Sequence, residues 1–342
     1  MSDSPYALGI GVGTRNRDGE WLEVFFPSPL LHPAAELAGA LADHAGGDTV
    51  TPVDGDTLKT IAGHCAEAGA ADLAAHCEAM ATSDRPAVMV ILSDDAAPAS
   101  VPEAYLKLQL ISHRLVKPHQ TDLSGVFAVL PNVAWTSEGA IDIRELTERQ
   151  LAARLSGRVL EVNSVDKFPK MTNYVVPAGV RIAHTARVRL GAYVGEGTTV
   201  MHEGFINFNA GTEGPNMVEG RISAGVTVGS GSDLGGGSST MGTLSGGGNI
   251  IISVGSDCLL GANAGLGIPL GDRCTVEAGL YITAGTRVNL LDENGDVVTT
   301  VKARDLAGQS DLLFRRNSIS GTVECLANRS AVELNQALHA HN

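Results

Sequence analysis

The sequence predicts an α/β N-terminal domain, then a parallel β-helix, then a small C-terminal capping segment. Three observations support this fold class. Helical and strand patterns alternate before residue 165, aliphatic residues then recur at an interval of six, and glycine makes up 41 of 342 residues, well above the usual share of about 7%. Because aromatic residues make up only 4% of the chain, the glycine excess indicates a repeat built on tight turns.

The predicted N-terminal domain, residues 1–165, combines helical patterns with short apolar strands. The helical patterns are 34–46, 57–82, 102–119 and 141–155. The strand patterns are 87–92 and 125–130. We therefore expect an ordinary α/β arrangement in this part of the chain.

Two features of this domain resemble functional sites only superficially. The run Gly9–Thr14 reads GIGVGT, but no helical pattern follows it, as a nucleotide-binding loop would require. His64 and His76 stand beside Cys65 and Cys77, but neither pair has a spacing favoured in zinc sites. We expect these side chains to occupy surface or core positions.

The predicted β-helix, residues 166–290, rests on the period of six. Neither a helix nor an ordinary strand has this period. A prism with three short parallel strands per coil does, since one aliphatic residue per side faces its axis and small residues turn its corners. The aliphatic positions are Val176, Ile182, Val188, Val194, Val200 and Ile206, then Ile222, Val228 and Leu234, then Val254, Leu260 and Leu266, and in a shifted frame Leu270, Val276, Ile282 and Val288.

Two segments interrupt the repeat, Asn207–Arg221 and Gly235–Asn249. We expect both to project from the prism as loops, where functional residues are often found. The alternative is that they only cover a flank. The spacing alone leaves both readings open.

The C-terminal segment, residues 291–342, is expected to cap the prism. Asn294-Gly295 predicts the turn of a β-hairpin. Lys302, Arg304, Arg315 and Arg316 give this segment a positive character that the rest of the chain lacks. On charge alone, the cluster is either an anion-binding site or a solvated basic face.

The composition bounds the location and partners of the protein. A formal net charge of -14 argues against binding to nucleic acid or to an anionic membrane. The five cysteines are odd in number and form no CxxC pair, which favours reduced thiols and a cytoplasmic location. The N-terminal sequence lacks the pattern of a signal peptide, and no apolar run approaches the roughly 18 residues of a membrane span.

Several strings are more specific than the repeat. KMTNYVVPAGVRIA, GTTVMHEGFINFNAGT, MVEGRISAGV, MGTLSGGGN, LLGANAGLGIPLGD, VEAGLYITAGT and LLFRRNS resemble the tetrahydrodipicolinate N-succinyltransferases of the branch with a long N-terminal domain, within the hexapeptide-repeat acyltransferases. The resemblance covers residues 100–340 and, more weakly, the N-terminus. It implies a left-handed parallel β-helix, a homotrimer and no required cofactor.

The resemblance also implies the reaction. Succinyl-CoA donates its succinyl group to the amine of hydrated, ring-opened tetrahydrodipicolinate, which gives N-succinyl-2-amino-6-ketopimelate and CoA in diaminopimelate and lysine biosynthesis. Glu219 matches the catalytic glutamate, either a general base or the carrier of a transient acyl anhydride. Arg221 matches a succinyl-CoA-binding position, since a guanidinium can hold a carboxylate through two hydrogen bonds.

The other implied positions line the path of CoA. Gly236 and Ser239 match binding positions, and a glycine allows close approach of a ligand to the backbone. The small or polar positions of the pantetheine groove are Ala262, Glu277, Ala278 and Gly285. The positions near the CoA phosphates are Lys302, Arg315, Arg316, Asn317 and Ser318.

Magnesium is a further implication of the resemblance. Some family members hold Mg²⁺ at the trimer axis through an Asp and a Glu from adjacent coils. Glu203 matches the Glu, but Ala186 stands at the Asp position. Because Mg²⁺ prefers several oxygen ligands, a site at Glu203 would depend on threefold repetition and water.

Three alternatives remain open at this point. A γ-type carbonic anhydrase would use His184 and His202, which lie one 18-residue coil apart, but it needs a third histidine, and residues 171–300 contain only these two. Another hexapeptide-repeat acyl-CoA transferase could act on an amino sugar or other amine. A non-catalytic scaffold could share the prism, but it would not release a thiol from any acyl-CoA.

Overall fold

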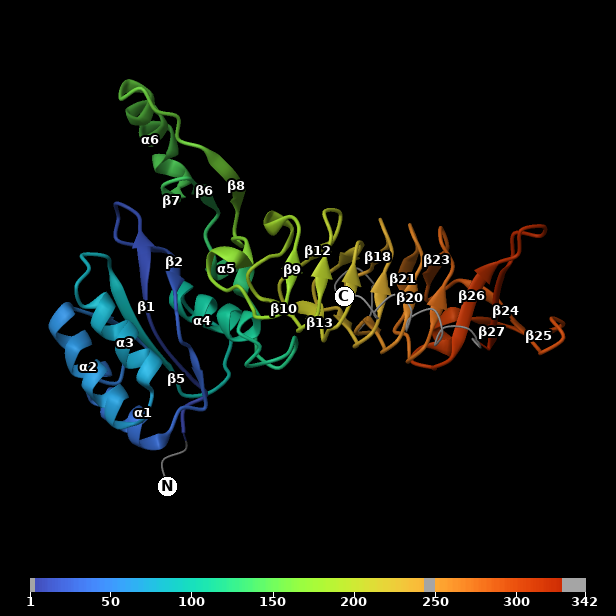
Figure 1. Cartoon of the computed structure of the whole chain (residues 1–342), viewed down its shortest axis with the longest axis horizontal. Coiled ribbons are helices and arrows are strands. Elements are labelled where there is room, and N and C mark those ends of the chain that lie inside the picture. Colours follow the sequence, from blue (N-terminus) through green and yellow to red (C-terminus); the bar gives the residue numbers. More distant parts are fainter. Residues whose placement is uncertain (1–3, 243–249, 328–342) are drawn as a thin grey trace. The chain divides into compact units, whose positions relative to one another are not determined.

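A computed structural model describes residues 4–242 and 250–327. The chain folds into two compact units, shown in Figure 1, and each is described here by itself. The first unit contains Met1–Leu110 and Gln120–Pro169, and the second contains Ile111–His119 and Lys170–Asn342.

The first unit contains a five-stranded antiparallel sheet with the order β2-β1-β5-β4, and β3 pairs with β1. Helices α1, α2 and α3 supply the apolar side chains that pack with it, among them Leu41 and Ile61 against Leu8 and Ile10. The elements are β1 (Ala7–Arg15), β2 (Trp21–Phe25), β3 (Leu30–Leu31), α1 (Ala35–Ala45), β4 (Val50–Val53), α2 (Gly55–Glu67), α3 (Ala71–Met80) and β5 (Ala87–Leu92).

The GIGVGT run lies inside strand β1 and forms no nucleotide-binding loop. Its glycines allow close packing against the next strand: a Cβ at Gly11 would lie 2.3 Å from the Phe25 carbonyl oxygen, and one at Gly13 would lie 2.2 Å from that of Glu23. Cys65 and Cys77 are buried in helices α2 and α3. Of the two expected alternatives, surface or core, the cysteines occupy the core.

The remaining elements of this unit include a three-stranded antiparallel sheet with the order β7-β6-β8. Helix α6 contacts β6 and β7. The elements are α4 (Val101–Ser112), whose last two residues belong to the second unit, α5 (Val126–Val129), β6 (Val133–Thr136), β7 (Gly139–Asp142), α6 (Ile143–Leu155) and β8 (Val162–Asp166).

Three predictions for this region were wrong in detail. The run 125–130 forms helix α5 rather than a strand, because Gly125 adopts a left-handed φ of 75° and begins a helical turn. The run 57–82 is divided into two helices around Gly69, whose φ is also left-handed. Helix α4 ends at Ser112 instead of continuing to residue 119, and Arg114 has a left-handed φ of 63°.

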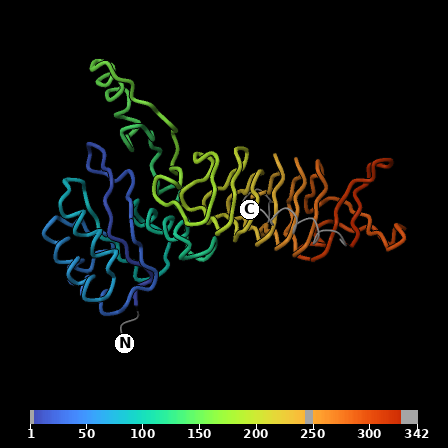
Figure 2. The backbone as a smooth tube through the Cα atoms, in the orientation of Figure 1, coloured from blue at the N-terminus to red at the C-terminus, as the bar shows by residue number. Residues whose placement is uncertain are grey.

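The second unit is a parallel β-helix with three sheets, and its stacked coils are seen in Figures 1 and 2. The first side contains β10 (Ala192–Val194), β13 (Ala210–Thr212), β16 (Thr227–Val228) and β19 (Ser253–Val254). The second contains β9 (Arg181–Ile182), β11 (Thr199–Val200), β14 (Met217–Val218), β17 (Asp233–Leu234), β20 (Leu259–Leu260) and β22 (Thr275–Val276). The third contains β12 (Phe205–Ile206), β15 (Arg221–Ile222), β18 (Ser239–Thr240), β21 (Gly265–Gly267) and β23 (Tyr281–Thr283).

The aliphatic positions of the repeat form the core of this prism. Every predicted position from Val188 to Val288 is buried. Ile182 is only half-buried, and Val176 is 71% exposed, so the repeat begins later than the sequence predicted. Val176 precedes β9, which is the first strand of the prism in the described residues.

The prediction that both interruptions project as loops was wrong for the parts that the structure describes. Residues 207–221 contain strands β13 and β14 within the coils. The step from Val200 to Val218 is 18 residues, but the step from Val218 to Leu234 is only 16. A shortened coil shifts the hexad frame without leaving the prism. In the second interruption, residues 235–240 also remain in a coil, and residues 243–249 lie outside the described residues.

The end of the chain extends the second side of the prism with β26 (Leu312–Arg316), which pairs in parallel with β22. Strands β24 (Arg287–Leu291) and β25 (Val297–Lys302) form the predicted hairpin, with Gly295 at a left-handed φ in the turn. Strand β27 (Val323–Ala327) joins β24 to β26. The short 3₁₀ helices are η1 (Met171–Asn173), η2 (Thr185–Arg187) and η3 (Ala303–Leu306).

Candidate active site

Many of the predicted site residues lie on one edge of the prism, where the second side turns into the third. We call this the second–third edge. Its turns are residues 201–204, 219–220, 235–238, 261–264 and 277–280. The predicted residues on it are Glu203, Glu219, Gly236, Ala262, Glu277 and Ala278. Parallel pairing between successive coils stacks these turns in one line.

Glu219 occupies the shortest turn on this edge. Only Glu219 and Gly220 separate β14 from β15, whereas each of the other four turns has four residues. The Glu219 N–H donates to the Leu234 carbonyl at 2.9 Å, which fixes the backbone on the next coil. The side chain is half-buried, and a Cβ built on Gly236 would lie 3.4 Å from its Oε2. The structure thus brings the Glu219 carboxylate against Gly236.

Gly220 and Ser238 form a close contact next to this carboxylate. A Cβ at Gly220 would lie 2.1 Å from Ser238 Oγ and 2.6 Å from the Ser238 carbonyl oxygen, so only glycine fits the turn. Ser238 is 1% exposed, and its hydroxyl has no hydrogen-bond partner within the described residues. Sequence reasoning missed Ser238, because a buried hydroxyl in a glycine- and serine-rich run has no distinctive pattern.

Arg221 and Ser239 are adjacent on the third side of the prism. The Arg221 Nε and Nη2 donate to Ser239 Oγ at 3.2 and 2.7 Å. Among the described residues no carboxylate lies within ion-pair distance of Arg221, in contrast to Arg144 and Arg273. The guanidinium therefore keeps an uncompensated charge and further donors, the requirement for binding an anion.

A pocket of about 510 Å³ includes Arg221. Its other lining residues are mostly neutral and polar or aromatic, namely Phe205, Asn207, Ser223, Thr240, Met241, Gly242 and Tyr281. A cation surrounded by neutral hydrogen-bonding groups favours a carboxylate over a cationic ligand. Sequence reasoning missed the polar members of this pocket because strand side chains from different coils meet only in three dimensions.

The C-terminal cations differ in how they are bound. The Arg315 Nε donates to Glu324 at 3.0 Å, and the Asn317 amide donates to the same carboxylate at 2.7 Å. The Asn317 amide and the Arg315 guanidinium lower the pKa of Glu324 below its usual value. Arg315 and Asn317 are therefore engaged in holding the capping strands together. The exposed Ser318 follows in the turn between those strands.

Arg316 lies at the end of the second–third edge. Its backbone N–H donates to Glu277 Oε2 at 2.7 Å. Its side chain is exposed, and within the described part of the chain the guanidinium has only the Gly321 carbonyl as a partner, at 3.4 Å. Lys302 and Gly285 lie near another corner, where the Ala303 N–H donates to the Thr286 carbonyl. Arg316 therefore lies on the same edge of the prism as Glu219, whereas Lys302 lies near Gly285 at a different corner.

The described residues do not form a metal site within one chain. No group of three or more His, Cys, Asp or Glu side chains among them could hold a metal ion. Glu203 is exposed on its turn, and Ala186 offers no ligand. Pairing of Ile182 with Val200 gives His184 and His202 equivalent places on successive coils, but a third histidine is missing from that group.

No helix in the part of the chain that the structure describes is both long and apolar enough to span a bilayer.

The fold and this site define the class of protein. Residues 251–284 match the family described as the hexapeptide repeat of succinyl-transferase. The stacked three-sided coils, with the Glu219 carboxylate in a turn and the Arg221 guanidinium at the start of the next strand, are those of a hexapeptide-repeat β-helix. Residues 130–170 match the family described as tetrahydrodipicolinate N-succinyltransferase, middle.

Full-length relatives identify the family. The chain is 65% identical to the 2,3,4,5-tetrahydropyridine-2,6-dicarboxylate N-succinyltransferase of Pseudomonas putida, with all of both chains covered. It is 63% identical to that of Vibrio cholerae, covering 98% of this chain and 99% of the relative. A crystal structure of a putative 2,3,4,5-tetrahydropyridine-2-carboxylate N-succinyltransferase from Campylobacter jejuni is 33% identical with a TM-score of 0.86, covering 97% and 94% of the two chains. The chain belongs to the 2,3,4,5-tetrahydropyridine-2,6-dicarboxylate N-succinyltransferase family.

Proposed function

We propose that this protein is an acyltransferase that moves succinyl from succinyl-CoA to the amine of hydrated, ring-opened tetrahydrodipicolinate. The products are N-succinyl-2-amino-6-ketopimelate and CoA, and the reaction belongs to diaminopimelate and lysine biosynthesis. Relatives that carry the name of this enzyme match along the whole chain. The structural observation that carries the proposal is the placement of Glu219 and Arg221 on either side of Gly220, with the Arg221 guanidinium bound to the Ser239 hydroxyl and to no carboxylate of the described residues.

The geometry supports a direct role for Glu219 in acyl transfer. In the general-base route, the carboxylate takes a proton from the amine, the amine nitrogen attacks the thioester carbon, and the carbon–sulfur bond breaks. The proton then passes to the CoA sulfur. In the anhydride route, the carboxylate attacks the thioester carbon and the carbon–sulfur bond breaks, which releases CoA as the thiolate. The amine nitrogen then attacks the succinyl carbon of the anhydride, the bond from that carbon to the Glu219 oxygen breaks, and the amine proton passes to the CoA thiolate. Both routes need the carboxylate at a fixed position beside the acyl group, and the short turn that holds the Glu219 backbone on the next coil supports this role.

Two neighbouring groups complete the proposed chemistry. The Gly236 N–H makes no hydrogen bond within the described residues, and a backbone N–H without a nearby Cβ can donate to the thioester oxyanion. Arg221 and Ser239 can anchor a substrate carboxylate, since no carboxylate of residues 4–242 and 250–327 pairs with the guanidinium. We assign this anchor to the succinyl group.

The second–third edge suits the pantetheine arm of CoA. Arg316 lies four strand steps beyond Glu219, which is roughly 19 Å at about 4.8 Å per step. Ala262 and Ala278, on intermediate turns, present small side chains to a passing chain. The exposed Arg316 is therefore a phosphate contact in this proposal, with Lys302 as a second cation. Arg315 contributes less because its charge is already balanced by Glu324.

The proposal extends to features that the family implies. The coils are left-handed, the enzyme is a cytoplasmic homotrimer, and each open edge receives its second wall from a neighbouring subunit. An Mg²⁺ ion at the trimer axis would require Glu203 from three chains and water. The functional division is an N-terminal domain in 1–165, the acyltransferase domain in 166–290 and the cap in 291–342. Analytical ultracentrifugation tests the trimer, and a fully active monomer would contradict it.

Release of CoA thiol tests the function. We expect thiol release from succinyl-CoA to require tetrahydrodipicolinate and to yield one succinylated acceptor per thiol. An amino sugar acceptor serves as the matched control for the alternative transferase. Faster turnover with the amino sugar, or no turnover with tetrahydrodipicolinate, would refute the proposed substrate.

A further inference from the structure

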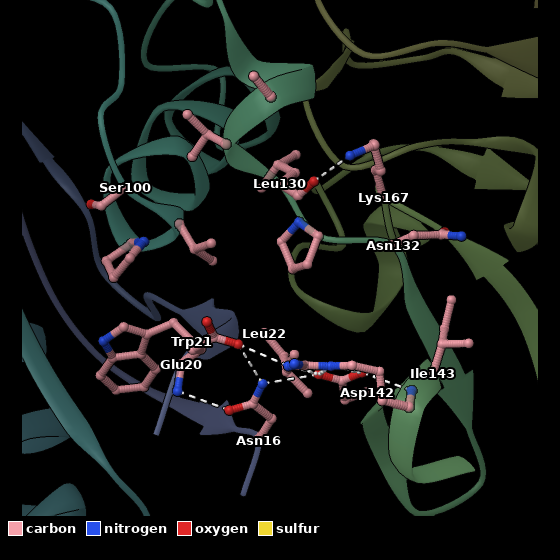
Figure 3. A pocket seen from close by; sticks show the side chains of 16 residues that line it. Asn16, Glu20, Trp21, Leu22, Ser100, Leu130, Asn132, Asp142, Ile143 and Lys167 are labelled. Carbon is pink, nitrogen blue, oxygen red and sulfur yellow. Dashed lines mark hydrogen bonds and ion pairs between the residues drawn. The ribbon is translucent and has the colours of Figure 1, made fainter. Parts of the chain in front are cut away.

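A second cavity, of about 630 Å³, lies within the first unit (Figure 3). Its size falls within the range of roughly 300–1,000 Å³ that is typical of small-molecule sites. None of its lining residues belongs to the second unit, so it is separate from the residues assigned to acyl transfer. The residues that decide its chemistry are Trp21, Pro102, Leu130, Pro131, Arg144 and Lys167.

On one side of the cavity, the carboxylates are already paired with donors of the protein. The Arg144 Nη2 donates to Glu20 Oε2 at 2.9 Å and to Asp142 Oδ2 at 2.7 Å. The Asn16 amide donates to the same two oxygens at 2.8 and 2.9 Å, and Figure 3 shows these contacts in one connected group. Both carboxylates therefore have partners, and they do not require a cationic ligand.

The cation on the opposite side is not balanced in this way. The Lys167 Nζ donates to the Leu130 carbonyl at 2.5 Å, and a dashed line marks this bond in Figure 3. No carboxylate of the described residues lies within ion-pair distance of Lys167, whereas the other lysines of the same unit, Lys59 and Lys107, each have one. An ammonium has three donors, so two N–H groups of the half-buried Lys167 remain for an anion.

Apolar side chains form part of the walls between these two sides. The Trp21 side chain and the Pro102 and Pro131 rings line the hollow, as Figure 3 shows for Trp21. Such walls favour a carbon skeleton. A second negative charge on the ligand would face the Glu20 and Asp142 carboxylates, which disfavours dicarboxylates and phosphates.

We propose that this cavity binds a small organic monocarboxylate, with the carboxylate on Lys167 Nζ and the carbon chain against Trp21 and the two prolines. The ligand would contact strand β2, the start of α4 and residues 128–132 together. Because these segments are far apart in the sequence, ligand binding should stabilise the first unit against unfolding. The site differs from the proposed active site in both its residues and its preferred ligand charge.

Calorimetric titration of the full-length protein with sodium hexanoate tests this site. We expect saturable binding with a Kd of about 1 mM or tighter, and no comparable binding of n-hexylamine or succinate. Lys167→Met should weaken hexanoate binding by about tenfold or more, through loss of a charge-assisted interaction. Lys59→Met, which removes an exposed lysine outside the cavity, is the matched control and should bind as the wild type does.

Tryptophan fluorescence then locates the ligand. The chain has two tryptophans, Trp21 and Trp135, so a Trp135→Phe variant reports on Trp21 alone. Hexanoate should change its emission with the calorimetric Kd, also when Arg221→Met is present. Absence of saturable binding, unchanged affinity in Lys167→Met, or loss of binding in Arg221→Met would overturn the proposal. The last result would place the carboxylate at the proposed active site instead.

Discussion

Replacement of Glu219 by glutamine tests the proposed chemistry most directly. The amide has nearly the same shape as the carboxylate, so it can keep the contact with Gly236, where a Cβ would stand 3.4 Å from the present Oε2. The backbone bond from Glu219 to Leu234 does not involve the side chain. We therefore expect an intact fold and unchanged binding of succinyl-CoA.

The expected loss is in kcat. An amide cannot accept the proton or form an acyl anhydride, and loss of a general base costs roughly 10²–10⁴ in rate. This factor corresponds to about 2.7–5.4 kcal/mol in the activation free energy. Steady-state thiol release gives kcat, and calorimetry gives the affinity for succinyl-CoA. Glu203→Gln, on the preceding turn of the same edge, is the matched control and should retain wild-type kcat.

Thiol release by the wild-type enzyme in the absence of acceptor distinguishes the general-base route from the anhydride route. An acyl anhydride predicts one equivalent of thiol per site from succinyl-CoA alone, and trapping with hydroxylamine should give succinyl hydroxamate. A general base predicts neither product without the acceptor. If Glu219→Gln has a kcat within about threefold of the wild type, the carboxylate has no role in the chemical step and the reasoning from the short turn fails.

Three further predictions concern other parts of the chain. Arg316→Ala should raise the KM for succinyl-CoA more than that for the acceptor, whereas Arg315→Ala should mainly lower the denaturation midpoint; equal effects on both KM values in Arg316→Ala would contradict the phosphate assignment. Lys107→Met should lower the free energy of unfolding by about 3 kcal/mol in chemical denaturation, because it breaks the ion pair between the fully buried Lys107 ammonium and the partly exposed Asp95 carboxylate. A loss under about 1 kcal/mol would refute this. The Arg144 guanidinium holds the pKa of the Asp142 carboxyl well below its usual range. The ionised carboxylate therefore stabilises the fold above about pH 5, and this contribution is lost as the pH falls below about 4. Asp142→Asn should flatten the acid dependence of the unfolding free energy, and an unchanged pH profile would contradict this assignment.

The N-terminal domain shows where local patterns are insufficient. The strand 87–92 was predicted with the observed bounds, since a short apolar run without glycine or proline has few alternatives. The similar run 125–130 became a helix because Gly125 adopts a left-handed φ. A sequence pattern alone does not reveal which glycine takes that conformation, because glycine tolerates both signs of φ.

In the candidate site, too, the sequence indicated some residues and only the structure revealed others. The resemblance pointed to Glu219, Arg221, Gly236 and Ser239, and the structure reveals two contacts among them, Glu219 with Gly236 and Arg221 with Ser239. Whether these residues act as proposed stays a prediction. The polar pocket around Arg221 could not be predicted, because its residues come from separate coils.

The period of six by itself determined that most of the second half forms a stacked prism, since only a three-sided coil places every sixth residue in one core. Tertiary structure alone decided where the coils are shortened. A turn that is two residues shorter shifts the hexad frame, and in the sequence this shift resembles a loop that leaves the prism. In the structure, hydrogen bonds to the next coil keep the strands on both sides of the short turn in the prism. Tertiary contacts also decided which guanidinium groups are balanced. Arg315 and Arg316 are alike in sequence, but among the described residues only the Arg315 guanidinium pairs with a carboxylate, that of Glu324.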